Sequence, residues 1–193
     1  MLLARLAAAA AITLTCLAVA PAASAAMSAK EKEQARADAQ KMSRETLDRL
    51  YRAEPGAKAA IAKSAGYAVF SNFGMKIFVA GSGKGQGVAV DNRAKKTIYM
   101  KMIEVQAGLG LGVKKFRLIW VFEDQKDFSN FVNSGYEFGG QASAAAKKGA
   151  QGGSYAGAVS VSPGVWLYQL TDEGLAAEIT AKGTKYYKDD DLN

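Results

Sequence analysis

Two short segments of this chain carry a glycine at every second position. The first series is Gly81, Gly83, Gly85 and Gly87, and the second is Gly108, Gly110 and Gly112. Because successive side chains of a β-strand point to opposite faces, each series leaves one face of a strand without side chains. A neighbouring backbone or side chain can therefore approach that face closely. The two series predict strands that pack tightly against other elements.

Phosphate binding is the functional alternative for these glycines. A Walker loop requires Ser or Thr after Lys84, where Gly85 stands, and Phe78 occupies the position of its leading glycine. A dinucleotide-binding fingerprint requires a third glycine, which is missing at each position tested in the two series. Since neither template fits, we interpret the glycines as packing residues and expect no nucleotide or other cofactor.

The residue types that the chain lacks narrow its chemistry. The sequence contains no histidine, and Cys16 is its only cysteine. Histidine-based acid–base catalysis, Ser-His-Asp triads, Cys-His dyads and zinc sites built from Cys or His are therefore excluded. A hydrolase based on carboxylates such as Glu104 remains as an alternative, but nothing in the sequence pairs Glu104 with a second carboxylate. We expect no enzymatic activity, no catalytic residue and no metal.

Two further features are interpreted as structural rather than functional. The acidic run Asp189–Asp191 lacks the spacing of a calcium-binding loop, so it is expected to form a frayed terminal tail. Trp120 and Trp166 lie in strand patterns. Both tryptophans are therefore expected to pack in the core rather than to stack on a ligand.

Residues 1–25 have the organisation of a secretory signal peptide. Arg5 is followed by an apolar stretch from Leu6 to Ala20, and Ala23-Ser24-Ala25 forms a small-x-small cleavage site. The stretch is short for a transmembrane helix, which needs about 20 apolar residues. Lipidation at Cys16 is a further alternative, but the residues before it form a poor lipobox. We expect a mature chain that begins at Ala26 and is exported to the periplasm or secreted, with peripheral attachment to membranes.

A helical pattern follows, and we assign residues 26–56 to an N-terminal helical segment. Ser28 and Glu31 form a capping box, which marks the first turn of a helix. Spacings of three and four then define one face, which consists of Ala35, Ala39, Met42, Thr46 and Leu50. Residues 28–54 contain seven basic and six acidic residues, so this amphipathic helix is nearly neutral. Its modest apolar face predicts packing on the domain rather than insertion into a membrane.

From Gly66 onwards the hydrophobic pattern becomes that of a sheet. Runs of β-branched and aromatic residues, separated by Gly, Asn and Asp, lie at residues 67–73, 76–80, 87–90 and 97–105. The segment Lys115–Phe122 ends in five consecutive apolar residues, which is typical of a strand buried on both faces. Short helices are expected at residues 57–65 and 124–133, and a last hairpin at residues 166–181. Residues 141–148 fit either a helix or a strand.

Together these patterns predict an α+β fold. The expected core is a glycine-rich, mostly antiparallel β-sheet or barrel-like structure. The N-terminal amphipathic helix precedes this core, and one or two further short helices accompany it. We assign residues 57–193 to this domain.

Several short motifs follow one another between residues 57 and 187. They are Gly66-Tyr67-Ala68-Val69-Phe70, Gly81-x-Gly83-Lys84-Gly85, Ala107-Gly108-Leu109-Gly110, Phe128-Ser129-Asn130-Phe131, Phe138-Gly139 and Ala142-Ser143-Ala144-Ala145. In order and spacing they resemble the SYLF family, whose domains accompany SH3 or FYVE modules in eukaryotes and stand alone in secreted bacterial proteins. The resemblance implies binding of anionic lipids, with phosphoinositides as ligands in eukaryotes and actin as a partner in a fungal branch. It implies no catalysis, and it favours a strand at residues 141–148.

Positive charge is concentrated in the glycine-rich segment. The whole chain has 25 Lys and Arg against 18 Asp and Glu, a formal net charge of +7. Residues 74–117 contain nine basic residues against two acidic ones, whereas residues 118–193 contain six basic and ten acidic residues. Lipid binding in the SYLF family is often ascribed to a basic helix ahead of the domain. The nearly neutral helix of this chain departs from that picture.

We therefore place the candidate lipid-binding site in the glycine-rich segment. Its candidate residues are Lys84, Lys95, Lys96, Lys114, Lys115 and Arg117. The two lysine pairs in this set are expected at strand ends, where they could converge on one rim, and an anionic partner would meet that rim.

The function predicted for this rim is non-enzymatic binding of anionic lipids of the phospholipid or phosphoinositide type. The alternative is a protein-interaction module that uses the same basic surface, with an actin-like, host or envelope protein as partner. A solvated surface without a partner is the remaining interpretation, because charge runs often only solubilise a domain. Export argues against nucleic acid.

Overall fold

The computed structural model describes residues 27–77, 80–107, 112–138, 155–176 and 183–193 of the chain. The helices are α1 (Ala29–Ala53), α2 (Gly56–Lys63) and α3 (Gln125–Asn133). The strands are β1 (Gly66–Ile77), β2 (Ala80–Asp91), β3 (Lys96–Ala107), β4 (Gly112–Phe122), β5 (Tyr136–Phe138), β6 (Val159–Ser162), β7 (Val165–Thr171), β8 (Gly174–Leu175) and β9 (Thr184–Lys188).

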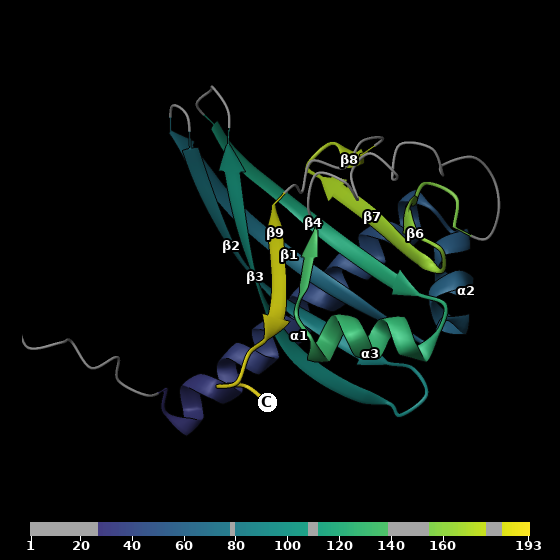
Figure 1. Cartoon of the computed structure of the whole chain (residues 1–193), viewed down its shortest axis with the longest axis horizontal. Coiled ribbons are helices and arrows are strands. Elements are labelled where there is room, and N and C mark those ends of the chain that lie inside the picture. Colours follow the sequence, from purple (N-terminus) through teal and green to yellow (C-terminus); the bar gives the residue numbers. More distant parts are fainter. Residues whose placement is uncertain (1–26, 78–79, 108–111, 139–154, 177–182) are drawn as a thin grey trace, which may run out of the picture.

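The described strands form one curled antiparallel sheet (Figure 1). Their order across the sheet is β5-β9-β3-β2-β1-β4-β7-β6, and β8 pairs with β7. Every strand pairing is antiparallel. With helices packed on this sheet, the predicted α+β fold is confirmed.

The two faces of the sheet carry separate hydrophobic cores. On one face, Phe128 and Phe131 of α3 pack against side chains of the central strands, including Trp120. On the opposite face, Leu50 of α1 packs in a second cluster with Ile119 of β4. Figure 1 shows α3 in front of the sheet and α1 behind it. We call these two sides the α3 face and the α1 face.

Strand β4 lies between β1 and β7 and is buried on both faces. Its side chains from Leu118 to Phe122 are exposed by 2% or less, which confirms the predicted central strand. Trp120 is fully buried, as expected. Trp166, however, is only half-buried, and its ring stacks on Tyr155 with 4.8 Å between the centroids. Trp166 therefore lies at the margin of the core and not inside it.

Strand β2 passes through the first glycine series without a break. A Cβ atom on Gly87 would overlap the Phe70 ring of β1. A Cβ atom on Gly85 would lie 2.5 Å from the Cγ atom of Met102 on β3, which is closer than such contacts occur. The predicted close packing is therefore confirmed at these two glycines.

The first strand is longer than the sequence pattern indicated. Gly74 does not end β1, because it pairs with Gly83 of β2 on one side and with Lys114 of β4 on the other. Ladder partners on both sides hold a residue extended even where its own β-propensity is low. The predicted separate strands at residues 67–73 and 76–80 are therefore wrong, and β2 begins well before the predicted strand at 87–90.

The predicted helix starts are confirmed by their capping contacts. At α1, the Glu31 N–H donates to Ser28 Oγ at 3.3 Å, and the Ser28 N–H donates to Glu31 Oε2 at 2.7 Å. At α3, the Asp127 N–H donates to Asp124 Oδ1 at 2.9 Å. Most of the side chains that α1 buries are small or polar: Ala39, Ser43, Thr46, Leu47 and Leu50. This composition fits the prediction that the helix packs on the domain.

Several segments differ from the predictions, and two predicted segments lie outside the described residues. The short strands β5, β6 and β9 were not predicted, while β7 and β8 confirm the first part of the predicted last hairpin. The segment 1–25, with its cleavage site and Cys16, lies outside the described residues, and so does the segment 141–148. In the part of the chain that the structure describes, no helix combines the length and hydropathy that a bilayer span requires.

Candidate functional site

The predicted lysines do not converge on one rim. Lys84 of β2 and Lys115 of β4 both stand opposite Phe73 of β1. Lys96 is in register, through Asp91 of β2, with Gly66 of β1. Gly66 lies seven residues before Phe73, which corresponds to roughly 23 Å at the usual strand rise. Strands β3 and β4 run in opposite directions, so their first residues lie at opposite ends of the sheet. The expectation of a single rim is therefore wrong.

One row of the α1 face does bring lysines together. Across β9, β3, β2, β1 and β4, the residues in register are Lys185, Ile103, Lys84, Phe73 and Lys115. Neighbouring strands lie about 4.8 Å apart, so this row spans roughly 19 Å. We call it the distal row. Its three lysines are exposed, and Ile103 is 37% exposed, which is unusual among the large apolar side chains of the described residues.

The distal row contains two residues that the sequence analysis missed. Ile103 and Lys185 become neighbours only through the pairing of β3 with β9, which no local pattern indicates. Lys185 Nζ lies 3.2 Å from Glu137 Oε1, and both side chains are largely exposed. Such surface pairs are worth about 0–1 kcal/mol, so Lys185 can exchange this partner for another anion. The side chain of the predicted Lys114 lies outside the described part of the structure.

Arg117 holds α1 on the sheet. Its Nη1 atom donates to Thr46 Oγ1 at 2.8 Å and to the Met42 carbonyl oxygen at 3.4 Å. Arg49 of α1 makes the converse contact from the helix to the sheet, because its Nη2 atom donates to the carbonyl oxygen of Thr171 on β7 at 2.7 Å. A cavity of about 220 Å³ lies beside these contacts and is lined by both arginines. The structure therefore gives Arg117 a place in helix docking.

A larger cavity of about 670 Å³ lies on the other side of α1, over β2 and β3. Ala39 and Met42 of α1 line it, as do Lys84 and Ile103 of the distal row and Lys101 of β3. Among the described residues, Lys84 has no ion-pair or hydrogen-bond partner. The distal row thus borders a hollow that combines apolar side chains with lysines.

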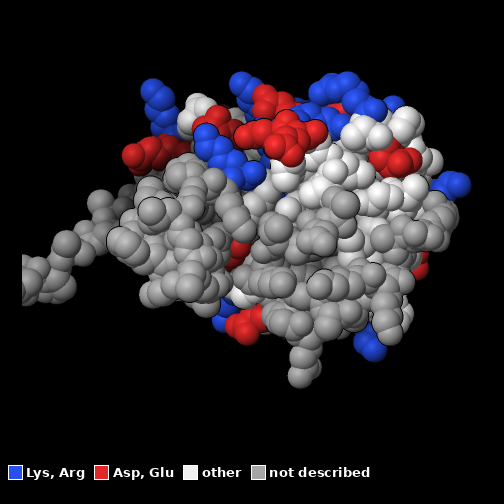
Figure 2. Space-filling model, turned by 90° about the horizontal axis from the view of Figure 1, so that it is seen from above, with Lys and Arg blue, Asp and Glu red and all other residues white. Residues whose placement is uncertain are grey.

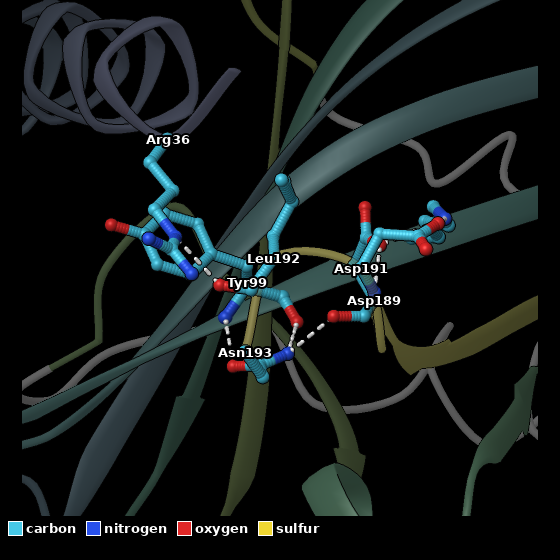
Figure 3. A network of polar contacts seen from close by, with 7 residues as sticks. Arg36, Tyr99, Asp189, Asp191, Leu192 and Asn193 are labelled. Atoms are coloured by element: carbon cyan, nitrogen blue, oxygen red, sulfur yellow. Dashed lines mark hydrogen bonds and ion pairs between the residues drawn. The ribbon is translucent and has the colours of Figure 1, made fainter. Parts of the chain in front are cut away.

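The C-terminal tail folds against β3 (Figure 3). Lys101 Nζ lies 2.8 Å from Asp189 Oδ1 and 3.3 Å from Asp191 Oδ2. These contacts, above all the hydrogen bond with Asp189, raise the pKa of Lys101. The Asn193 side chain accepts the Tyr99 N–H at 3.0 Å and donates to the Tyr99 carbonyl oxygen at 2.8 Å. The expectation of a frayed acidic tail is wrong, because the tail continues β9 along the edge of β3.

The same tail also reaches α1. Arg36 Nε donates to the Leu192 carbonyl oxygen at 2.7 Å, and the Arg36 guanidinium lies 5.9 Å from the centroid of the Tyr99 ring. Gln40 Nε2 donates to the Tyr99 hydroxyl at 2.6 Å. Leu192 is buried in a small cluster with Ala39 of α1. The tail, β3 and the first half of α1 therefore form one contact network.

Lys95 and Lys96 stand at the other end of the sheet, around the turn from β2 to β3. Both are exposed, and Lys95 has a φ of +54°. Asp91 faces Lys96 in register, and its Oδ1 atom accepts the N–H groups of Ala94 at 2.8 Å and Arg93 at 2.9 Å. The Ala94 contact is the main reason why the pKa of Asp91 is lowered. This end therefore carries an ionised acid beside its lysines at neutral pH.

The surface seen in Figure 2 carries no uninterrupted basic patch among its described residues. Lys and Arg side chains gather along one edge of the view, and Asp and Glu side chains stand between them. An anionic partner that approached this side would meet mixed charges. The positive charge that the composition indicates is therefore dispersed here.

Glu104, the carboxylate considered for catalysis, is buried on the α3 face. It is 1% exposed and pairs with Thr184 of β9. Tyr186, two residues further along β9, is fully buried, and this burial raises the pKa of its hydroxyl. A carboxylate in this position does not face solvent. The described residues also contain no group of three side chains that could hold a metal ion.

These features define a class of protein: a small α+β sheet domain with an exposed row of lysines beside a partly apolar hollow. Residues 103–193 match the family described as "Ysc84: Las17-binding protein actin regulator". This match confirms, for residues 103–193, the resemblance to the Ysc84/SYLF family that the order of the motifs predicted. The description of this family is that of proteins that bind Las17 and regulate actin.

A bacterial relative is also found. The chain is 31% identical over 153 residues to "Beta cell expansion factor A" of Aeromonas veronii. The alignment covers 78% of this chain and 56% of the relative, so the chain spans about half the length of that protein. The match extends the family likeness beyond residues 103–193, toward the N-terminal part of the chain.

Proposed function

We propose that the protein binds anionic lipid membranes peripherally through the distal row. The supporting observation is the alternation of exposed lysines with the exposed Ile103 across neighbouring strands of the α1 face. A membrane surface offers many phosphates in one plane, which suits a row of cations better than a single charged pocket would. The apolar side chain between the lysines could enter the interface beside the phosphates.

The expected affinity follows from the number of charges. Each Lys near an anionic membrane contributes about 1 kcal/mol. The three lysines of the distal row then supply about 3 kcal/mol, and partial burial of Ile103 adds a fraction of the roughly 1.5–3 kcal/mol that full burial provides. A total of about 4 kcal/mol corresponds to millimolar binding. Contact with a membrane is therefore expected to be weak, reversible and sensitive to salt.

Co-sedimentation with vesicles tests this proposal by means of two variants with the same change in charge. Lys84→Glu/Lys115→Glu reverses two of the three lysines of the distal row, and Lys95→Glu/Lys96→Glu reverses the lysines at the β2–β3 turn. The first variant should lose binding to vesicles that contain phosphatidylglycerol, whereas the second should keep most of it. Salt should weaken wild-type binding, because the Debye length falls from about 10 Å at 0.1 M to about 3 Å at 1 M.

The other results have distinct meanings. Loss of binding in the Lys95→Glu/Lys96→Glu variant alone would move the site to the β2–β3 turn. If the wild-type protein ignores anionic vesicles, lipid binding itself is wrong. A protein partner then becomes the better proposal, which the family's description as an actin regulator supports. Far-UV circular dichroism of both variants should match the wild type, because all four lysines are exposed.

We also propose that the protein is exported, with cleavage after Ala25. The support is the arrangement of Arg5, the apolar stretch and the small-x-small site in residues 1–25. Mass spectrometry of the protein from its native cell should give a chain that begins at Ala26. A species that retains Cys16 with an acyl group would contradict export as a cleaved, unlipidated protein.

A further inference from the structure

The cavity beside α1 has the size of a small-molecule site. Its volume of about 670 Å³ lies within the range of roughly 300–1,000 Å³ that such sites occupy. Helix α1 contributes Ala39 and Met42, and β3 contributes Ile103. Ile103 is 37% exposed, and among the described residues Met27, at 36%, is the one other large apolar side chain exposed to this extent. The apolar surface of this cavity is therefore available to a ligand.

Hydrogen bonds fix the helical wall of the cavity on both sides of Met42. One helical turn is held by Gln40, whose Nε2 donates to the Tyr99 hydroxyl at 2.6 Å. The next turn is held by Thr46, which accepts from Arg117 at 2.8 Å. A wall that is fixed before a ligand arrives lowers the ordering cost of binding.

The two lysines of the cavity differ in their availability. Lys101 is engaged by Asp189 at 2.8 Å and by Asp191 at 3.3 Å. Lys84, by contrast, has no ion-pair partner among the described residues. Asp38, on the helical side of the cavity, accepts a hydrogen bond from Gln34 and would repel an anion. An anionic group in the cavity should therefore lie on the sheet side, at Lys84.

We propose that this cavity holds one acyl chain of an anionic lipid, with its charged head at Lys84. The apolar wall of Met42 and Ile103 suits the chain, and the free ammonium suits the head. An acidic peptide would leave the apolar wall uncovered, and a neutral apolar molecule would leave the charge unused. The inference rests on the proposed function, in which the distal row brings the protein to a membrane. It adds that a single lipid molecule of that membrane is bound by the cavity.

Dodecanoate, kept below its critical micelle concentration, tests the proposal without a membrane. In protein labelled at the methionine methyl groups, NMR should show a shift at Met42, which lines the cavity from α1, but not at Met100 and Met102, whose side chains are buried in the core of the α3 face. Calorimetry on the same solutions gives the affinity. Dodecyltrimethylammonium, which has the same chain and the opposite charge, should bind much more weakly.

Two substitutions test separately how much the acyl chain and the charged head of the ligand contribute to binding. Gln86→Phe fills the cavity from an exposed position on β2 and should weaken dodecanoate binding by at least about tenfold, because a filled cavity has no room for the chain. Lys84→Met removes the charge and should weaken binding by about tenfold, the usual effect of losing a charged hydrogen bond. Lys58→Met, at an exposed site on α2, is the control and should bind as the wild type does.

An unshifted Met42 signal at high dodecanoate, equal shifts at all methionines, or unchanged affinity in Gln86→Phe would each overturn the proposal. Vesicle co-sedimentation of the same protein keeps the two proposals apart. Binding to vesicles without binding of dodecanoate would leave the distal row as a purely superficial contact. Binding of dodecanoate without binding to vesicles would sustain the cavity as a lipid site and contradict peripheral membrane binding.

Discussion

Gly87 occupies a position where a side chain is physically excluded. It lies on β2 beside the ring of Phe70, which is fully buried and stands 4.8 Å from the Tyr186 ring, centroid to centroid. Because these two rings come from β1 and β9 and pack in one core, neither can move without disturbing the other. Gly87 thus serves the packing of an aromatic side chain on the α3 face, as Gly85 makes room for Met102.

Gly87→Ala should therefore destabilise the protein by about 1–3 kcal/mol, the usual cost of overpacking a core. Gly56→Ala is the matched control, because the added methyl would meet only the flexible end of Glu54, at 3.2 Å. That control should be neutral or slightly stabilising, since alanine favours a helix over glycine. Urea unfolding of both variants measures the difference. Equal free energies of unfolding would mean that Phe70 moves aside readily.

At the scale of elements, the turn from β2 to β3 depends on one carboxylate. Asp91 accepts the N–H groups of Arg93 and Ala94 through Oδ1, and Gln125 Nε2 donates to its Oδ2 atom at 2.7 Å. These hydrogen bonds, with that of Ala94 first, lower the pKa of Asp91 below its ordinary value of 3.8. The ionised form is therefore favoured in the folded state.

The consequence is a loss of stability in acid. The contribution of Asp91 is complete above pH 3.8 and disappears as the pH falls through the lowered pKa. Asp91→Asn keeps an oxygen acceptor but does not titrate, so its urea midpoint should fall less than that of the wild type between about pH 5 and pH 2. Parallel curves for the two proteins would show that the turn does not depend on the charge of Asp91.

Elements with local signals were predicted from the sequence, and those that depend on distant partners were not. The capping residues Ser28 and Asp124 mark helix starts because each forms its capping hydrogen bond with a residue of the helical turn that follows it. The uninterrupted apolar run that ends at Phe122 marks a buried strand for the same reason. Strand β9 has no such signal, since Lys185 and Lys188 interrupt it and its pairing with β3 supplies its stability.

The candidate site shows the same limit at the scale of the whole molecule. Composition pointed to residues 74–117, which include Lys84 and Lys115, but the row that joins these two lysines with Lys185 exists only through the order and register of five strands. Charge runs were therefore a poor guide to which lysines meet. The cavity over β2 and β3 could not be predicted either, because it depends on where α1 crosses the sheet.

Helix α1 acts as a brace that joins distant parts of the molecule. Near its start, Arg36 contacts the C-terminal tail, and near its end, Arg49 contacts Thr171 of β7. Between them, Arg117 of β4 reaches Thr46. These polar contacts set the position of α1 together with the apolar packing of Leu47 and Leu50 on the sheet.

Arg117→Met tests this bracing role against the lipid-binding role predicted from the sequence. The variant keeps a long side chain but loses the hydrogen bonds to Thr46 and Met42. Its free energy of unfolding, measured with urea, should therefore be about 1–3 kcal/mol lower than that of the wild type. Arg44→Met, at an exposed position of α1, has the same change in charge and should be nearly neutral. At temperatures where both variants are folded, they should bind anionic vesicles equally well. If Arg117→Met is as stable as Arg44→Met but binds vesicles more weakly, Arg117 contacts lipid, and the row of cations extends beneath the helix.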